Sequence, residues 1–267
     1  MKSPVKYLTA VIPTRNRPKD IIACVSALLP LQTVNEVIIA DDSDESILSD
    51  PLIVCLIDAF RAAGKMMAVV RPPVQSVSYA RAYAAALASN EFVLTLDDDN
   101  IVATDFHKFE NFIGDRPFLS FVVYDVNNSY RWNDWRRERQ DMNQLYDREG
   151  KRIRYYHRYN SHFVRDVHYG PGTCIMRKED AVDAYYLAYT QFSPTQRDED
   201  AWATCKLATR NGEYGIFSSK FMALHVVRIA EQHREWDYSI ISEAEPDMAE
   251  FEKRFWAMVE SVHGAKV

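Results

Sequence analysis

The sequence predicts an α/β domain built around a mostly parallel sheet flanked by helices, and two observations lead to this fold class. In the first part of the chain, short apolar runs alternate with longer segments whose apolar residues recur at helical spacing. Such alternation is typical of right-handed crossovers in a doubly wound sheet. The length of 267 residues, with 47% hydrophobic and 26% charged residues, suits one large domain with a sizeable core.

Each element is expected from a local pattern. The first strands are short apolar runs that end in polar residues, and they cover residues 8–12, 36–40, 66–70 and 92–96. Between them, helices are expected to start at Pro18, to span residues 52–63 and end at Gly64, and to span residues 76–88. For the less regular second half we expect strands at 118–123, 215–217 and 221–227, and helices at 178–189, 200–209 and 246–262.

Two acidic clusters follow strands of this sheet. Asp41 and Asp42 come after the second strand, and Asp97, Asp98 and Asp99 come after the fourth. Ligands of open α/β sheets bind at the carboxyl ends of the strands, so both clusters are expected to face one crevice. Adjacent carboxylates repel one another, and Mg²⁺ or Mn²⁺ offsets that charge through oxygen ligands. The alternative is a solvated acidic turn.

Three segments of the chain resemble the signature segments of the family 2 glycosyltransferases, in the same order and at similar spacing. They are VIPTRNR at 11–17, EVIIADDS at 36–43 and LDDD at 96–99. The resemblance covers roughly the first 110 residues closely and the remainder loosely. It implies a single GT-A domain over 1–267, with a nucleotide-sugar-binding half at 1–115 and an acceptor-binding half at 116–267. The implied activity is transfer of a hexose or pentose from a nucleotide-sugar, with a UDP-sugar favoured.

The resemblance also assigns the donor side of the site. The residues expected to contact the donor are Pro13, Thr14, Arg15, Asp42, Arg81, Asp97 and Asp98. The loop at 13–15 and Asp42 are expected at the nucleobase and ribose, and Asp97 or Asp98 at the nucleoside or sugar. The family often carries an aromatic residue where Arg15 stands, although a guanidinium can also stack on a base. For Arg81, the alternative is an exposed helix charge.

Asp99 is expected to bind Mn²⁺ or Mg²⁺, again by resemblance. His225 lies in a late apolar segment and is the candidate third ligand, because a histidine from the C-terminal part completes the metal site in many GT-A enzymes. The alternative for His225 is a hydrogen-bonded residue of the core.

On the acceptor side, Gly172 and Thr173 lie in a stretch that resembles the family's border between donor phosphate and acceptor. Asp198, Glu199 and Asp200 follow at the start of an expected helix, where carboxylates also serve as caps. The family places an acidic pair here, which makes Asp200 the candidate base, with Glu199 or Asp198 as fallback. One direct displacement would invert the anomeric centre.

The acceptor itself is open. Residues 130–169 contain ten Lys/Arg and six Asp/Glu, a local charge of +4, with interleaved tyrosines and tryptophans. This composition suits phosphates and stacked bases, so one hypothesis is a hydroxymethylated base in DNA. A structured insert whose arginines pair with its own acids is the alternative for this segment. A cell-surface polysaccharide or a glycolipid is the alternative acceptor.

Two other classes of protein share some of these features. Nucleotidyltransferases also use strand-end carboxylates and Mg²⁺, but their first loop is usually rich in glycine, and the loop at 13–17 has none. A non-catalytic nucleotide-binding module is the second. The net charge of −6 argues against a protein coated in basic residues. The apolar runs are too short for a membrane span and the four cysteines are scattered, so we expect no membrane insertion, no disulfides and a cytoplasmic location.

Overall fold

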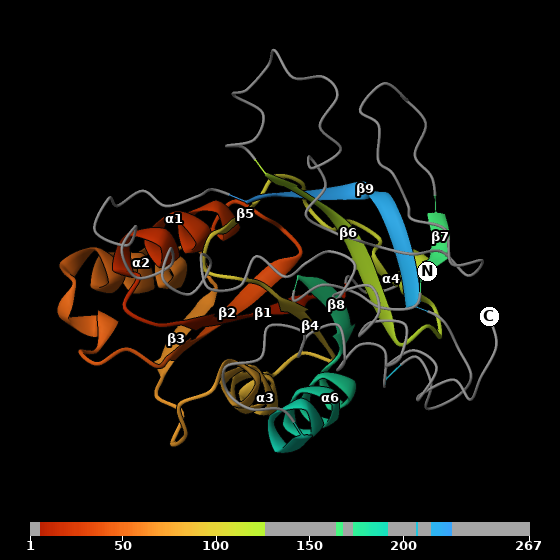
Figure 1. Ribbon diagram of the computed structural model, residues 1–267. Coiled ribbons are helices and arrows are strands. Elements are labelled where there is room, and N and C mark those ends of the chain that lie inside the picture. The colour runs from red at the N-terminus through yellow and green to blue at the C-terminus, as the bar shows by residue number, and fades with distance from the viewer. Residues whose placement is uncertain (1–5, 126–163, 168–172, 192–206, 208–214, 226–267) are drawn as a thin grey trace, which may run out of the picture.

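The computed structural model describes residues 6–125, 164–167, 173–191, 207 and 215–225 (Figure 1). Within these ranges a single mixed sheet forms the centre of the molecule. Its strands lie in the order β3 (Met66–Val70), β2 (Val34–Asp41), β1 (Leu8–Thr14), β4 (Phe92–Thr95), β8 (Cys174–Arg177), β6 (Phe118–Asp125), β9 (Gly215–His225) and β5 (Asn100–Val102), and β7 (Val164–Val167) pairs with β9. The helices are α1 (Pro18–Leu28), η1 (Ile47–Ser49), α2 (Pro51–Ala62), α3 (Val77–Leu87), α4 (Glu110–Ile113) and α6 (Lys178–Gln191).

The first four strands form the expected parallel half of the sheet. β1 lies between β2 and β4 and runs parallel to both, and β3 extends the sheet beyond β2. Beyond β4 the sheet becomes mixed, because β8 pairs antiparallel with β4 and with β6. The α/β class predicted from the sequence is therefore confirmed. The four neighbouring parallel strands β1 to β4 carry the two acidic clusters, and β6 and β9 form a further parallel pair.

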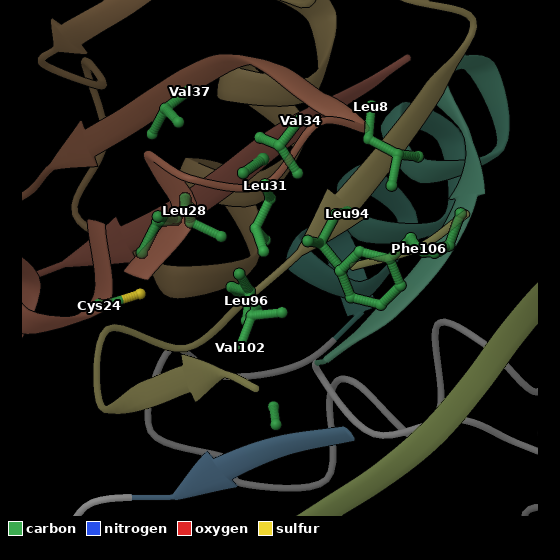
Figure 2. Packing of buried hydrophobic residues seen from close by; sticks show 14 of the residues in the cluster. Leu8, Cys24, Leu28, Leu31, Val34, Val37, Leu94, Leu96, Val102 and Phe106 are labelled. Atoms are coloured by element: carbon green, nitrogen blue, oxygen red, sulfur yellow. The ribbon is translucent and has the colours of Figure 1, made fainter. Parts of the chain in front are cut away.

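Side chains alternate between two cores, one on each face of the sheet. In β1, Leu8, Ala10 and Ile12 pack in one core, and Val11 packs in the other. Helices α1 and α2 cover the first face, whereas α3 and α6 lie side by side on the second (Figure 1). Figure 2 shows the first core, where residues of α1 and its following turn pack against strands β1, β2 and β4. Burial on both faces explains why β1, β2 and β4 are mostly apolar, and the buried Glu36 of β2 is accommodated by hydrogen bonds from the Thr9 hydroxyl and from Ser89.

Local chemistry sets the helix boundaries. Pro18 and Pro51 each occupy a first-turn position, where a missing N–H costs no hydrogen bond. The Asp50 side chain accepts a hydrogen bond from the Leu52 N–H at 2.9 Å, and Ser76 accepts one from the Tyr79 N–H at 3.3 Å. After α2, Gly64 adopts a φ of 72°, which suits a residue without a β-carbon.

Asp105 ties the loop after β5 to the turn before β2. Its carboxylate accepts hydrogen bonds from the backbone N–H of Gln32 at 2.7 Å and of Phe106 at 2.8 Å, and from the Thr33 hydroxyl. Burial alone would raise the pKa of Asp105, but these hydrogen bonds outweigh it and hold the pKa below its usual value.

Several elements differ from the sequence prediction. β5 and β8 were not expected, and the two strands expected at 215–217 and 221–227 are one strand, β9, whose register against β6 shifts once between Phe121 and Val122. Apart from Leu207, the helices expected at 200–209 and 246–262 lie outside the described residues.

Cys24, Cys55 and Cys174 are free thiols. In the described part of the chain, no helix has both the length and the apolar character needed to cross a bilayer.

Candidate active site

Loops after β1, β2 and β4 meet at the carboxyl ends of these strands. The Asp42 N–H donates to the Thr14 carbonyl at 2.9 Å, which joins the first two loops. The Thr14 hydroxyl donates to Asp98 Oδ2 at 2.7 Å, which joins the first loop to the acidic turn after β4. These hydrogen bonds therefore bring together Thr14, Asp42 and Asp98, which lie far apart in the sequence.

The three carboxylates of the acidic turn have different surroundings. Asp98 is 5% exposed, whereas the side chains of Asp97 and Asp99 are 42% and 20% exposed. The Arg17 guanidinium lies between two of them, with Nη1 at 3.0 Å from Asp98 Oδ1 and 3.7 Å from Asp99 Oδ2. Arg81 forms an ion pair with Asp97. The repulsion expected for this acidic turn is thus offset in part by two arginines.

Burial governs the ionisation of this turn. It raises the pKa of Asp98 to about 7; the Arg17 charge opposes this shift and the Asp99 charge adds to it. For Arg17, burial would lower the pKa, but the attraction of Asp98 and Asp99 outweighs it and raises the pKa. Asp98 and Arg17 therefore form a paired unit in the centre of the site.

Arg81 is 1% exposed, so the alternative of an exposed helix charge is wrong. Its guanidinium carbon lies 5.4 Å from the centre of the Tyr185 ring, in cation–π geometry, while it also pairs with Asp97. A buried arginine on α3 thus reaches through the second core to the acidic turn after β4.

The predicted nucleobase side lies at the ends of β1 and β2. The Arg15 guanidinium is 3.8 Å from Asp44. With the Gln75 amide oriented so that its oxygen faces Arg15, this oxygen accepts a hydrogen bond from Arg15 Nη2 at 2.7 Å. Burial raises the pKa of Asp42, and the Arg15 charge partly offsets this. Pro13 lies in β1 and is buried. A cavity of about 660 Å³ opens beside these loops, with Asp44 in its lining.

Asp41 and Asp42 differ in role although they are adjacent. Asp41 is fully buried and accepts hydrogen bonds from the backbone N–H groups of Ser43 at 3.1 Å and Ile47 at 3.0 Å. It therefore shapes the loop after β2. Asp42 is only partly buried, which leaves its carboxylate available to a ligand.

On the acceptor side, Thr173 is buried and its hydroxyl accepts a hydrogen bond from Asn100 Nδ2 at 2.7 Å. The same amide group lies 3.3 Å from Asp97 Oδ2, so Asn100 connects the acidic turn with the start of β8. Asn100 Oδ1 is buried without a hydrogen-bond partner among the described residues. The other predicted residues of this side, Gly172, Asp198, Glu199 and Asp200, lie outside the described residues.

The candidate metal ligands are brought near each other by the sheet. The backbone of His225, the last residue of β9, pairs antiparallel with that of Asn100, the residue after Asp99. Within the described ranges, no three His, Cys, Asp or Glu side chains already converge as a metal cluster. Carboxylate and imidazole are nevertheless ligands that suit Mn²⁺.

In a comparison with protein families, residues 9–186 match the family described as Glycosyl transferase family 2. The chain belongs to this family. The match extends beyond the acidic turn into α6, so it includes every strand of the parallel half. No curated protein sequence matches the chain.

Solved structures place this family 2 chain in the GT-A fold. The structure of GalNAc-T7 with UDP, GalNAc and Mn²⁺ gives a TM-score of 0.58 at 13% identity, over 84% of this chain and 44% of that one. S. aureus TarS gives 0.54 at 18% identity, over 96% of this chain and 43% of that one. S. aureus TarS 1–349 in complex with UDP gives 0.52 at 16% identity, over 96% and 70%. The chain thus spans less than half the length of the first two.

Sequence reasoning missed two residues of the site in this family 2 chain. Arg17 lies at the end of the first signature segment, and Asn100 directly follows the acidic turn. A signal existed for Arg17, because three adjacent carboxylates require nearby positive charge. None existed for Asn100, because its role depends on the pairing of β4 with β8.

Proposed function

We propose that the chain transfers a sugar from a nucleoside-diphosphate-sugar to an acceptor hydroxyl, with inversion and with a divalent cation. The observation that carries this proposal is the convergence of Thr14, Asp42 and the acidic turn at the carboxyl ends of β1, β2 and β4. Family membership supports the reaction class. The solved structures supply the donor class: one contains UDP, GalNAc and Mn²⁺, and another contains UDP.

In this proposal the donor is held by residues at the carboxyl ends of these strands. Asp42 and the loop of Pro13, Thr14 and Arg15 receive the nucleobase and ribose, and Arg15 supplies a planar guanidinium that can stack on a base. Asp98 is held by the Thr14 hydroxyl and by Arg17, and this fixed position supports its assignment beside the nucleoside or sugar.

Asp99 and His225 are the proposed ligands of Mn²⁺ or Mg²⁺. They fit on two grounds: the Asp99 carboxylate is partly exposed, and the strand pairing sets His225 beside Asn100. A bound divalent cation would neutralise charge that develops on the diphosphate leaving group. Arg81 keeps Asp97 in place, and Asn100 links that carboxylate to Thr173 at the acceptor side.

Asp200 is the proposed base, with Glu199 or Asp198 in reserve. It would remove the proton from the acceptor hydroxyl as the oxygen attacks the anomeric carbon, and this single displacement inverts that carbon. The acceptor-binding half is assigned to residues 116–267. Within it, the basic and aromatic segment at 130–169 supports a hydroxymethylated base in DNA as the acceptor. A polysaccharide or glycolipid acceptor is the competing outcome.

A thermal-shift panel tests the donor site first. UDP-, GDP-, dTDP- and CMP-sugars are compared with and without Mn²⁺, since a ligand that binds only the native state raises the unfolding temperature. We expect a metal-dependent rise with a UDP-sugar. Asp99→Asn should lose the metal-dependent part, whereas Asp58→Asn, an exposed carboxylate on α2, serves as the matched control. No rise with any nucleotide-sugar would refute the donor site.

Transfer is tested separately. Asp200→Asn should bind the donor as the wild type does but lose transfer, and normal transfer by this variant would remove Asp200 as base. Acceptor choice is read from DNA carrying hydroxymethylated bases, matched unmodified DNA, and glycan and glycolipid acceptors with a radiolabelled donor. Transfer to the glycan or lipid alone would reject the DNA acceptor while leaving the transferase proposal in place.

A further inference from the structure

Arg17 bridges two carboxylates with one guanidinium nitrogen. Its Nη1 is within hydrogen-bond distance of Asp98, at 3.0 Å, but 3.7 Å from Asp99, where only ion pairing remains. The contact to Asp98 is fixed further by the Thr14 hydroxyl on the other carboxylate oxygen. Arg17 can therefore give up Asp99 while it keeps Asp98.

We propose that Arg17 competes with the divalent cation for Asp99, so that the cation binds tightly only together with the donor. The inference rests on the proposed function, in which Asp99 is a metal ligand. In the protein without ligands, the Arg17 charge partly neutralises the carboxylate that the cation needs. A cation that binds without the donor is repelled by the Arg17 charge and must also break the ion pair between Arg17 and Asp99. The negative charge of a donor diphosphate compensates for this repulsion and for the lost ion pair.

The competition has a thermodynamic consequence. If the nucleotide relieves a repulsion between Arg17 and the cation, it must tighten cation binding, and by linkage the cation must tighten nucleotide binding by the same factor. Without Arg17, the cation no longer competes with this guanidinium for Asp99, and its dependence on the nucleotide falls. A residue that only holds the loop in shape has the opposite effect, because its removal would loosen Asp99 and weaken cation binding.

Arg17→Gln tests this, with Mn²⁺ affinity measured by electron paramagnetic resonance of the free ion, with and without UDP. The partly exposed pair between Arg17 and Asp99 suggests a gain of roughly five- to tenfold in Mn²⁺ affinity without UDP. Arg61→Gln removes the same charge from the exposed end of α2 and should leave the affinity unchanged. Adding Asp99→Asn to Arg17→Gln should abolish the gain, which places the ion at Asp99.

Equal or weaker Mn²⁺ binding by a folded Arg17→Gln variant would overturn the inference while leaving the metal site intact. Absence of Mn²⁺ binding by both proteins, even with UDP, would refute the proposed metal site and the inference with it. If Arg17→Gln does not fold, Arg17→Met carries the test. Methionine removes the charge and keeps most of the side-chain volume, so Mn²⁺ should again bind more tightly than in the wild type. Unchanged affinity in a folded Arg17→Met variant would then overturn the inference.

Discussion

Removing Arg81 and removing Asp97 both break the ion pair between them, but the two changes should lower the free energy of unfolding by very different amounts. Arg81 is 1% exposed, whereas the Asp97 side chain is 42% exposed and retains the Asn100 amide as a neighbour. Asp97→Ala leaves a buried guanidinium without this carboxylate, for which we expect a loss of about 3 kcal/mol in the free energy of unfolding. Arg81→Met keeps most of the buried volume and leaves Asp97 to water, so about 1 kcal/mol is expected.

The double variant separates the pair from its parts. Once Arg81 is methionine, Asp97→Ala no longer strands a buried charge, and its cost should fall to about 1 kcal/mol, a coupling of about 2 kcal/mol. Urea unfolding followed by circular dichroism, in EDTA and without nucleotide, measures all four proteins. A loss of stability in the double variant equal to the sum of the losses in the two single variants would refute the argument. A larger loss for Arg81→Met than for Asp97→Ala would do so as well.

Three further outcomes follow from other parts of the structure. Asp105→Asn should cost about 1–2 kcal/mol at pH 7. Because the folded pKa of Asp105 lies below the unfolded one, this difference should shrink in urea titrations as the pH falls below about 4; a difference independent of pH would contradict it. Gly215→Ala places a β-carbon 2.0 Å from the buried Phe118 ring and should lower stability by about 1–3 kcal/mol, seen in the urea midpoint. In Arg15→Gln, the pKa of Asp42 should rise further, because the charge that lowers it is removed. As the pH falls, UDP binding measured by calorimetry should therefore be lost at a higher pH than in the wild type. An unchanged pH midpoint would show that Arg15 does not control the ionisation of Asp42.

The parallel half of the fold could be predicted because its signals are local. Runs of apolar residues at 8–12, 36–40, 66–70 and 92–96 correspond to β1, β2, β3 and β4, and Pro18, Gly64 and Ser76 mark helix ends as expected. Each signal comes from residues a few positions apart, and buried parallel strands are apolar on both faces. The position of the acidic clusters then followed from the strand order alone.

The remainder could not be predicted, because it depends on contacts between distant segments. β5 is three residues long and becomes a strand only through β9, and β8, where no strand was expected, is defined by its pairing with both β4 and β6. Arg81 could not be placed by its sequence either: an arginine in an alanine-rich helix is usually exposed, and only the packing of α6 over α3 buries it.

The pairing of β5 with β9 affects the order in which parts of the protein fold during synthesis. Asn100 leaves the ribosome long before His225, and three residues cannot hold a strand without a partner. The parallel half can therefore collapse while the chain is still being made, because its contacts close early. The turn that carries Asp99 gains its neighbour only when the last described strand arrives. In the proposed function, the metal site would therefore be completed late in folding, and a nascent chain that ends before β9 would lack the proposed ligand His225.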